Sequence, residues 1–150
     1  MKLVVQRVIN SSCEIEGKIT GKSDKGYMVL VGMGPGDNED IVQKMAQKLL
    51  KLRVFEDEAG KINKSIIDIG GNILSISQFT LYADCTSGNR PSFSGAMEPV
   101  EAKRLYLYFN EYLRNQGMHV EEGIFAADMK ISLINDGPIT IILDSKEIVK

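Results

Sequence analysis

Only two segments of the chain space their apolar residues as an α-helix requires. In the first, Ile41, Met45 and Leu49 recur at helical intervals, which predicts a helix from about residue 38 to residue 52. Asp37 stands just before this helix, where a short acidic side chain favours an N-cap. Most of the core must therefore come from apolar segments of another kind.

The second helix is expected between Pro99, which suits a first helical turn, and Gly117, which is typical of a helix end. Leu105 and Phe109 lie on its apolar face. The other apolar segments are short and bounded by turn residues, as β-strands are. The expected strands span residues 2–8, 12–16, 19–23, 27–33, 72–82, 118–122, 130–134 and 139–143. This pattern predicts an α+β fold, with a curved antiparallel-rich sheet or open β-barrel and two helices packed on it.

Length and charge restrict the class of protein. With 150 residues, the chain is expected to form one domain, residues 1–150. Its net charge of −2 lacks the basic surplus of a non-specific phosphate binder, so any RNA partner must be recognised locally. Cys13 and Cys85 are expected to be reduced thiols in a cytoplasmic protein. No apolar run approaches the length of a membrane span, so no membrane partner is expected.

Two strand-like segments contain groups that a buried strand does not normally carry. The segment Ser77-Gln78-Phe79-Thr80 brings polar side chains into the strand of residues 72–82. The segment Asn135-Asp136-Gly137-Pro138 separates the last two strands. Taken alone, the first is best interpreted as an edge strand with satisfied hydroxyls and the second as a hairpin turn. Two such segments together indicate a site, because buried polar groups cost free energy unless they are satisfied.

Two other motifs are interpreted as structural. The segment Gly32-Met33-Gly34-Pro35-Gly36 joins a strand to a helix, but Asp37 stands where a dinucleotide-binding fingerprint has its third glycine. His119 is the only histidine, so a triad or metal site built on histidine has at most one member. Thr80 could act as a nucleophile only with a base beside it, and the sequence shows none. None of these motifs indicates a metal ion or an organic cofactor.

Several motifs, in the same order, resemble those of the D-aminoacyl-tRNA deacylases of the D-tyrosyl-tRNA deacylase type. They are the two polar segments, Val5-Gln6-Arg7-Val8, Leu52-Arg53-Val54-Phe55-Glu56-Asp57 and Gly88-Asn89-Arg90-Pro91-Ser92-Phe93. The resemblance runs nearly end to end. It implies a homodimeric hydrolase that cleaves the ester between a D-amino acid and the 3′-terminal adenosine of tRNA. L-aminoacyl esters would be rejected, and glycyl-tRNA mischarged on a non-cognate tRNA would also be cleaved.

The resemblance also implies roles for particular residues. The backbone amides of Phe79 and Thr80 would hold the developing oxyanion, with the ribose 2′-hydroxyl of the substrate assisting. Gly137 and Pro138, joined by a cis peptide bond, would project into the partner's active site as a chiral gate that Arg7 holds in place. The aminoacyl-adenosine end would bind to Ser77, Gln78, Phe125 and Met129.

One position departs from the family pattern. Ala126 stands where the family commonly has glycine, in the segment Phe125-Ala126-Ala127-Asp128-Met129. If that backbone adopts a positive φ or approaches the ligand closely, the additional methyl group narrows the pocket.

Two alternatives use the same residues. The first is a non-catalytic dimeric module that binds nucleic acid or aminoacyl groups and releases no product. The second is a hydrolase of another small ester or amide with Thr80 as its nucleophile. The second alternative predicts a covalent adduct on Thr80 and no need for a ribose 2′-hydroxyl.

Overall fold

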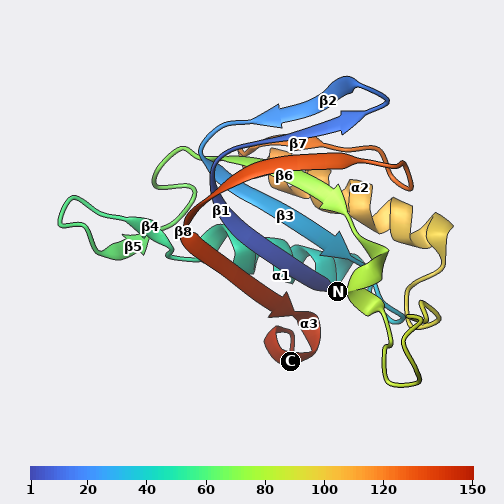
Figure 1. Cartoon of the computed structure of the whole chain (residues 1–150). Coiled ribbons are helices and arrows are strands. Elements are labelled where there is room, and N and C mark those ends of the chain that lie inside the picture. Colours follow the sequence, from blue (N-terminus) through green and yellow to red (C-terminus); the bar gives the residue numbers. More distant parts are fainter.

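The fold is organised around its two longest strands, which lie side by side in the curved sheet of Figure 1. β1 and β8 pair antiparallel along most of their length, from Lys2 opposite Asp144 to Glu14 opposite Lys130. Neighbouring strands of the sheet follow one another in the order β2-β1-β3-β6-β7, and β8 pairs with β1 outside this path. The computed structural model describes all 150 residues. The strands of this sheet are β1 (Lys2–Ile15), β2 (Lys18–Ser23), β3 (Gly26–Gly32), β6 (Asn72–Ser77), β7 (His119–Glu122) and β8 (Lys130–Asp144).

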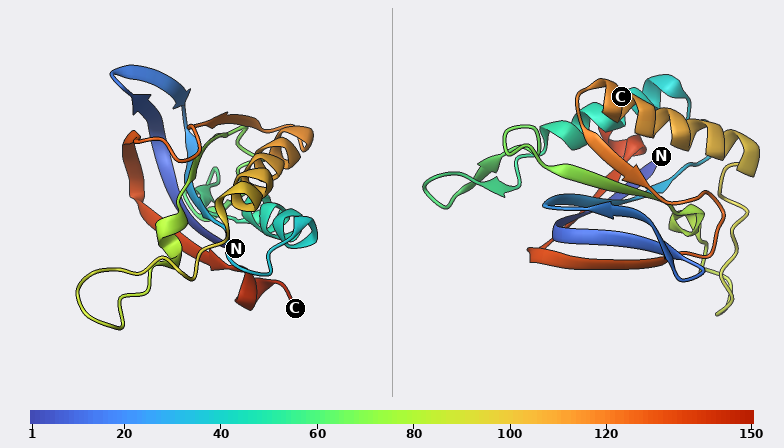
Figure 2. Two further views of the ribbon diagram at one scale, coloured as in Figure 1. Left: turned by 90° about the vertical axis from the view of Figure 1, so that its right-hand side faces the viewer. Right: turned by 90° about the horizontal axis from the view of Figure 1, so that it is seen from above.

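The sheet is strongly curved in both views of Figure 2 and forms a nearly closed barrel. Its edge strand β2 approaches β7 so closely that a Cβ atom on Gly21 would lie 2.9 Å from the carbonyl oxygen of Glu122. β1 pairs antiparallel with three strands, whereas β6 pairs in parallel with β3 and β7, so the sheet is mixed. The expected α+β fold with a curved sheet or open barrel is confirmed.

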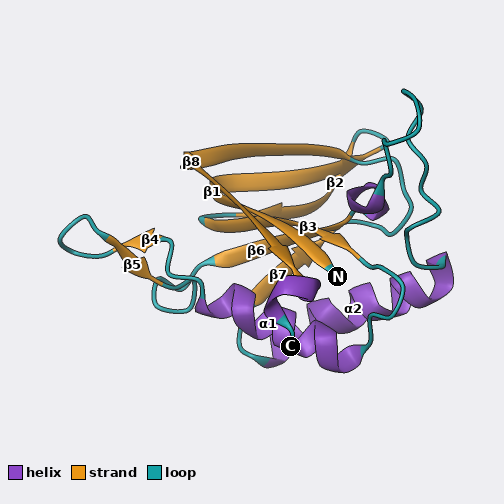
Figure 3. Ribbon diagram, turned by 90° about the horizontal axis from the view of Figure 1, so that it is seen from below, coloured by secondary structure: helices purple, strands orange, loops and turns teal.

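The helices α1 (Glu39–Lys51), α2 (Pro99–Asn115) and α3 (Ser145–Ile148) lie together on one side of the sheet, as Figure 3 shows. The sequence predicted the first two but not the single turn of α3. The core lies between these helices and the sheet, where the apolar faces of both are removed from water. Its fully buried members include Leu3, Val29, Ile73, Met45, Leu49, Leu105 and Phe109.

The N-cap of α1 is Asn38 rather than the expected Asp37. The Asn38 side-chain oxygen accepts a hydrogen bond from the Ile41 amide at 3.0 Å. The Asp37 carboxylate instead accepts from the Gly34 amide at 2.7 Å and pairs with the amino group of Met1 at 2.5 Å. The glycine-rich motif is thus a strand-to-helix turn, as predicted, and Asp37 stabilises that turn.

The strand expected over residues 72–82 ends at Ser77 and is followed by the 3₁₀ turn η1 (Phe79–Tyr82). The edge strand predicted for residues 77–80 is therefore wrong beyond Ser77. The physical reason lies at the end of β3, where Gly32 and the nearby Gly34 leave room for the turn to pack. A Cβ atom on Gly32 would lie 3.1 Å from the Leu81 side chain, and one on Gly34 would lie 2.4 Å from the Tyr82 ring.

The hairpin expected at residues 135–138 is also wrong, because β8 continues through this segment. On either side of it β8 pairs with the same strand, with Thr140 opposite Gln6 and Asn135 opposite Val8. The residues between them bulge out of the ladder, and the long partner strand holds both halves in one direction. β1 is likewise one strand where two were expected.

A short hairpin after α1 was not predicted. It consists of β4 (Phe55–Glu56) and β5 (Ile62–Lys64), which are too short for a periodic signal. Phe55 is buried and its ring lies 5.2 Å from that of Tyr27, so the hairpin is attached to the core. No helix is long and apolar enough to cross a membrane.

Candidate active site

A cavity of about 450 Å³, here called the main cavity, lies where β6 ends. Its walls are the end of β6 with the start of η1, the first turns of α2, and the connection between β7 and β8. Ten of its 14 lining residues are hydrophobic, so a bound group would be largely removed from water.

The main cavity collects five of the residues that the sequence placed at the site: Ser77, Gln78, Phe79, Phe125 and Met129. They come from segments far apart in the sequence. β6 and β7 are parallel neighbours, so the segments that follow them emerge at the same edge of the sheet. Sequence reasoning missed the wall formed by Ala96, Met97, Pro99 and Ala102. Pro99 signals a helix start, but nothing in the sequence indicates what that start faces.

Phe79 and Thr80 begin η1, immediately after Gln78. The Gln78 side chain makes no capping bond to the turn; its amide nitrogen donates to the Thr80 hydroxyl at 2.5 Å instead. No other side chain forms a hydrogen bond with that hydroxyl, and no histidine, lysine or carboxylate is among its partners. The first backbone amides of the turn therefore lack a side-chain acceptor, while Thr80 lacks a base.

An exposed pair of aromatic rings lies at the same turn. Phe79 is 56% exposed, and its ring meets that of Phe93 edge to face, with centroids 5.0 Å apart. Phe93 belongs to the polar loop after η1, where Asp84 and Ser92 form an isolated bridge. The pair brings the Gly88–Phe93 motif of the sequence to the edge of the main cavity.

Ala126 adopts a left-handed backbone conformation on the cavity wall, with φ of +67°. Only one other non-glycine residue, Glu16, has a positive φ. A side chain in this conformation is strained, whereas glycine is not. The backbone at Ala126 thus has the positive φ considered in the sequence analysis, and Ala126 is part of the cavity wall.

The Gly137–Pro138 peptide bond is cis, as the family resemblance implied. Both residues are exposed and neither lines the main cavity of its own chain. Figure 1 shows the bend of β8 and the η1 turn at opposite ends of the sheet. A Cβ atom on Gly137, whose φ is +144°, would lie 2.9 Å from the Ile139 amide nitrogen, so this position requires glycine.

Two side chains hold this segment from either side. Arg7 is buried, with its Nε donating to the Asp136 carbonyl at 2.8 Å and its Nη1 to the Val54 carbonyl at 2.7 Å. Asn135 accepts from the Ile139 amide at 2.8 Å and donates to the Ile139 carbonyl at 3.2 Å. Hydrogen bonds to the residues on either side of the exposed dipeptide therefore hold it in place.

One surface depression is lined largely by lysine side chains. A depression of about 470 Å³ between α1 and the C-terminal residues is lined by Lys44, Lys48, Lys51 and Lys150, and no carboxylate side chain lines it. We call it the lysine groove. Lys44 also pairs with Asp40 at 2.7 Å.

No group of three or more His, Cys, Asp or Glu side chains is arranged to hold a metal ion.

Fold and site together define a small barrel protein with a largely apolar cavity. Asp128 is the only ionisable residue that lines this cavity, so it holds no acid–base pair, and Thr80 lies outside the lining. The family model described as D-Tyr-tRNA(Tyr) deacylase matches residues 4–144. The chain therefore belongs to this deacylase family.

A relative of known family supports this assignment, and two solved structures share the fold. A D-aminoacyl-tRNA deacylase of Deinococcus deserti is 54% identical over 144 residues, which cover 96% of this chain and 99% of the relative. A solved structure titled "c-Myc DNA Unwinding Element Binding Protein" is 40% identical, with a TM-score of 0.89. The match covers 96% of this chain and 98% of the chain in that structure. A "probable eukaryotic D-amino acid tRNA deacylase" shares the fold, with a TM-score of 0.80 at 15% identity and coverage of 95% and 97%.

Proposed function

We propose that this protein hydrolyses the ester bond of D-aminoacyl-tRNA and releases free D-amino acid and tRNA. The observation that carries the proposal is the main cavity itself. Within a chain that belongs throughout to the deacylase family, it gathers Ser77, Gln78, Phe79, Phe125 and Met129 around one space. Its volume and apolar walls suit an aminoacyl-adenosine end.

Backbone groups and the substrate supply the chemistry in this proposal. The amides of Phe79 and Thr80 stabilise the oxyanion that forms when water attacks the ester carbonyl. The ester is already activated, so positioning a water molecule beside it provides much of the remaining acceleration. The ribose 2′-hydroxyl assists proton transfer. The absence of a base among the partners of the Thr80 hydroxyl supports a mechanism without a protein nucleophile.

The protein acts as a homodimer in which Gly137 and Pro138 of one subunit enter the main cavity of the other. The dipeptide is exposed, lies away from the cavity of its own chain and is held by Arg7. On the same strand Ile134 is 52% exposed and Ile142 is 71% exposed, which is an apolar surface that association would cover.

The dipeptide works as a chiral gate by steric exclusion. D and L esters carry the same functional groups, so only the direction of the side chain distinguishes them. A rigid backbone segment close to the α-carbon excludes the L side chain. Glycine has no side chain to exclude, so glycyl-tRNA is also cleaved. The enzyme proofreads aminoacyl-tRNA in the cytoplasm.

The lysine groove offers a place for the phosphates of the tRNA body. Net charge does not favour nucleic acid, but four lysine side chains line this one surface. Each lysine that neutralises a phosphate releases a counterion, so this contact should weaken as salt concentration rises.

A mixed-dimer experiment tests the cross-subunit site. One chain carries Gly137→Ala, which disrupts the gate, and the other carries Phe125→Asp, which places a charge on the cavity wall. A mixed dimer has one site with an intact cavity from the first chain and an intact gate from the second. We expect selective D-ester hydrolysis to return on mixing. If mixing restores nothing although mixed dimers form, the gate does not act across the interface.

A nucleic-acid-binding module without turnover is the second candidate. The 40% identical structure named as a DNA unwinding element binding protein favours it. The two candidates differ in their product. With one protein molecule per charged tRNA, a binding module leaves the ester intact, whereas a hydrolase releases the amino acid.

A further inference from the structure

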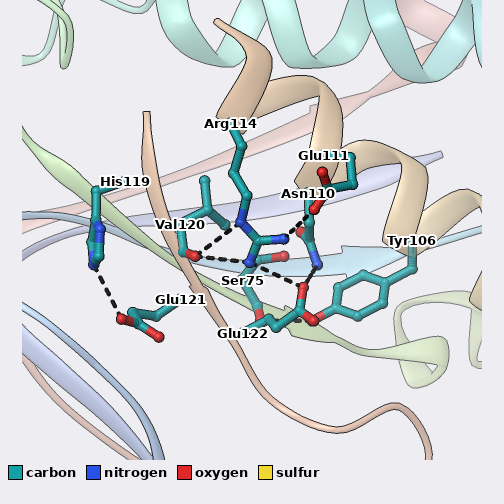
Figure 4. Close-up of polar contacts among 9 residues, drawn as sticks. All are labelled: Ser75, Tyr106, Asn110, Glu111, Arg114, His119, Val120, Glu121 and Glu122. Carbon is teal, nitrogen blue, oxygen red and sulfur yellow. Dashed lines mark hydrogen bonds and ion pairs between the residues drawn. The ribbon is translucent and has the colours of Figure 1, made fainter. Parts of the chain in front are cut away.

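Helix α2 carries a polar stripe on the face that packs against the sheet. Tyr106, Asn110 and Arg114 recur every four residues and point toward β6 and β7, as Figure 4 shows. Tyr106 is 1% exposed and Asn110 is fully buried. Apolar side chains would normally occupy such a face, because buried polar groups stabilise a fold less than well-packed apolar ones.

The first residue of the stripe forms a hydrogen bond with β6, the strand whose last residues line the main cavity. The Tyr106 hydroxyl donates to the Ser75 carbonyl at 2.7 Å, and the Gly123 amide donates to the same oxygen at 3.3 Å. Burial raises the pKa of Tyr106, so the hydroxyl keeps its proton and remains a donor at neutral pH. One carbonyl thus joins α2, β6 and the residue that follows β7.

The rest of the stripe holds β7 itself. The Asn110 side-chain nitrogen donates to the Glu122 carboxylate at 2.6 Å, and Arg114 donates to the Val120 carbonyl at 2.9 Å and to Glu122 at 3.4 Å. β7 is only four residues long, and β6 is its only ladder partner. Figure 4 shows these contacts reaching the strand from the helix side.

The end of β7 determines where the cavity wall starts. Glu122 is its last residue, and the chain then runs through Gly123 to the wall residues Phe125, Ala126 and Met129. The Phe125 ring lies 6.1 Å from the Tyr106 ring, so the first residue of the stripe also contacts the wall directly.

We propose that Tyr106 and Asn110 are positioning residues that fix the Phe125–Met129 wall of the main cavity and thereby set its affinity for the substrate's aminoacyl-adenosine end. This proposal rests on the proposed function. Neither residue lines the main cavity, so each acts through β6, β7 and the wall. One unmet hydrogen-bonding group supports a positioning role for Asn110, because its side-chain oxygen is buried without a partner. An apolar residue would avoid that penalty.

The same helix offers matched controls. Tyr108 and Tyr112 also use their hydroxyls, but toward α1, where they accept from Gln43 and Gln47. Tyr106→Phe, Tyr108→Phe and Tyr112→Phe each remove one oxygen atom and one hydrogen bond. Only the first change affects the cavity wall.

The test compares KM and kcat for D-aminoacyl-tRNA in the three variants. We expect Tyr106→Phe to raise KM about tenfold with kcat within about twofold of wild type, because the loss is in binding. The two controls should change KM by less than about twofold. Asn110→Leu should raise KM in the same direction as Tyr106→Phe. A Tyr106→Phe variant whose melting temperature falls while its KM stays at the control value would overturn the proposal.

Binding of a non-cleavable amide analogue of D-aminoacyl-adenosine separates this inference from the function on which it rests. Its Kd for Tyr106→Phe should exceed that of Tyr108→Phe about tenfold. If the wild type binds the analogue but cleaves no ester, the proposed hydrolysis fails, and the Kd ratio still decides the positioning role. Equal Kd values for the two variants would refute it.

Discussion

Replacing Arg7 by methionine should destabilise the protein and loosen the gate together. The Arg7 side chain is 7% exposed, and its guanidinium makes two hydrogen bonds to carbonyl oxygens, at 2.8 Å and 2.7 Å. Its ion pair with Asp136 is long, at 3.7 Å, and that carboxylate is 40% exposed, so it adds little. Methionine keeps the apolar stem but leaves both carbonyls without this donor.

The two hydrogen bonds decide the magnitude. A hydrogen bond to a charged group contributes about 1.5–3 kcal/mol, so two contribute about 3–6 kcal/mol. Removing a buried charge returns part of this, because its desolvation is no longer required. We therefore expect the free energy of unfolding to fall by about 2–4 kcal/mol, which a domain of ordinary stability survives.

Urea unfolding followed by circular dichroism measures this loss, since the chain has no tryptophan. Arg53→Met is the matched control. Arg53 donates to the exposed Asn63 carbonyl at 2.9 Å, so its loss should cost less than about 1 kcal/mol. Arg7→Lys should fall between the two, because an ammonium group cannot reproduce the geometry of the planar fork.

The functional consequence is assayed where the variant remains folded. With Asp136 released, the Gly137–Pro138 segment should move and cleavage of L-aminoacyl-tRNA should appear. An Arg7→Met variant that loses less than about 1 kcal/mol, or one that keeps full rejection of L esters, would refute the role assigned to Arg7.

Four further predictions follow from single features of the structure. Thr80→Ala should keep substantial activity in single-turnover assays, because loss of a true nucleophile costs several orders of magnitude. Ala126→Gly should raise the free energy of unfolding in urea by about 0.5–1 kcal/mol, since it relieves a φ of +67°, and should improve KM for bulkier D substrates. Burial raises the pKa of Tyr27 and of Tyr106, so the stability linked to them is complete below pH 10. This stability should be lost as pH rises above 10, because the two tyrosines ionise at lower pH in the unfolded chain than in the folded protein. Tyr106→Phe should therefore reduce the loss of stability in alkaline unfolding curves. Replacing Lys48 and Lys51 by glutamate should raise KM for charged tRNA and flatten its salt dependence, without changing KM for a short aminoacyl-adenosine substrate.

The helices were predictable because their signals are local. The apolar spacing around Met45 and the positions of Pro99 and Gly117 depend only on neighbouring residues, and both helices lie where they were expected. The N-cap differed by one residue, because the Asp37 carboxylate is used by Gly34 and the amino group of Met1 instead.

Two errors at the site have non-local causes. The apolar segments on either side of Gly137 resemble a hairpin, and only pairing of both with the long β1 makes them one strand. The strand at residues 72–82 stops at Ser77 because Gly32, at the end of β3, and the nearby Gly34 leave space for η1. Neither interaction can be read from the segment that it reshapes.

The residues of the main cavity were predictable only in part. Phe125 and Met129 followed from family resemblance, and β6 and β7 bring them next to Gln78. The stripe on α2 has no sequence signature of a site, because Tyr106 and Asn110 occur at ordinary helical spacing. Their importance appears only when the carbonyl of Ser75 and the carboxylate of Glu122 are placed opposite them.

A time course of hydrolysis on one tRNA charged with a D-amino acid, its L form or glycine tests the central claim most directly. The account predicts rapid release of the D-amino acid with little dependence on its side chain, measurable release of glycine, and almost none of the L-amino acid. Efficient cleavage of the L ester would show that no chiral gate operates. Complete resistance of the glycyl ester would show that selection needs a positive contact with the D side chain, and an intact D ester would contradict the hydrolase itself.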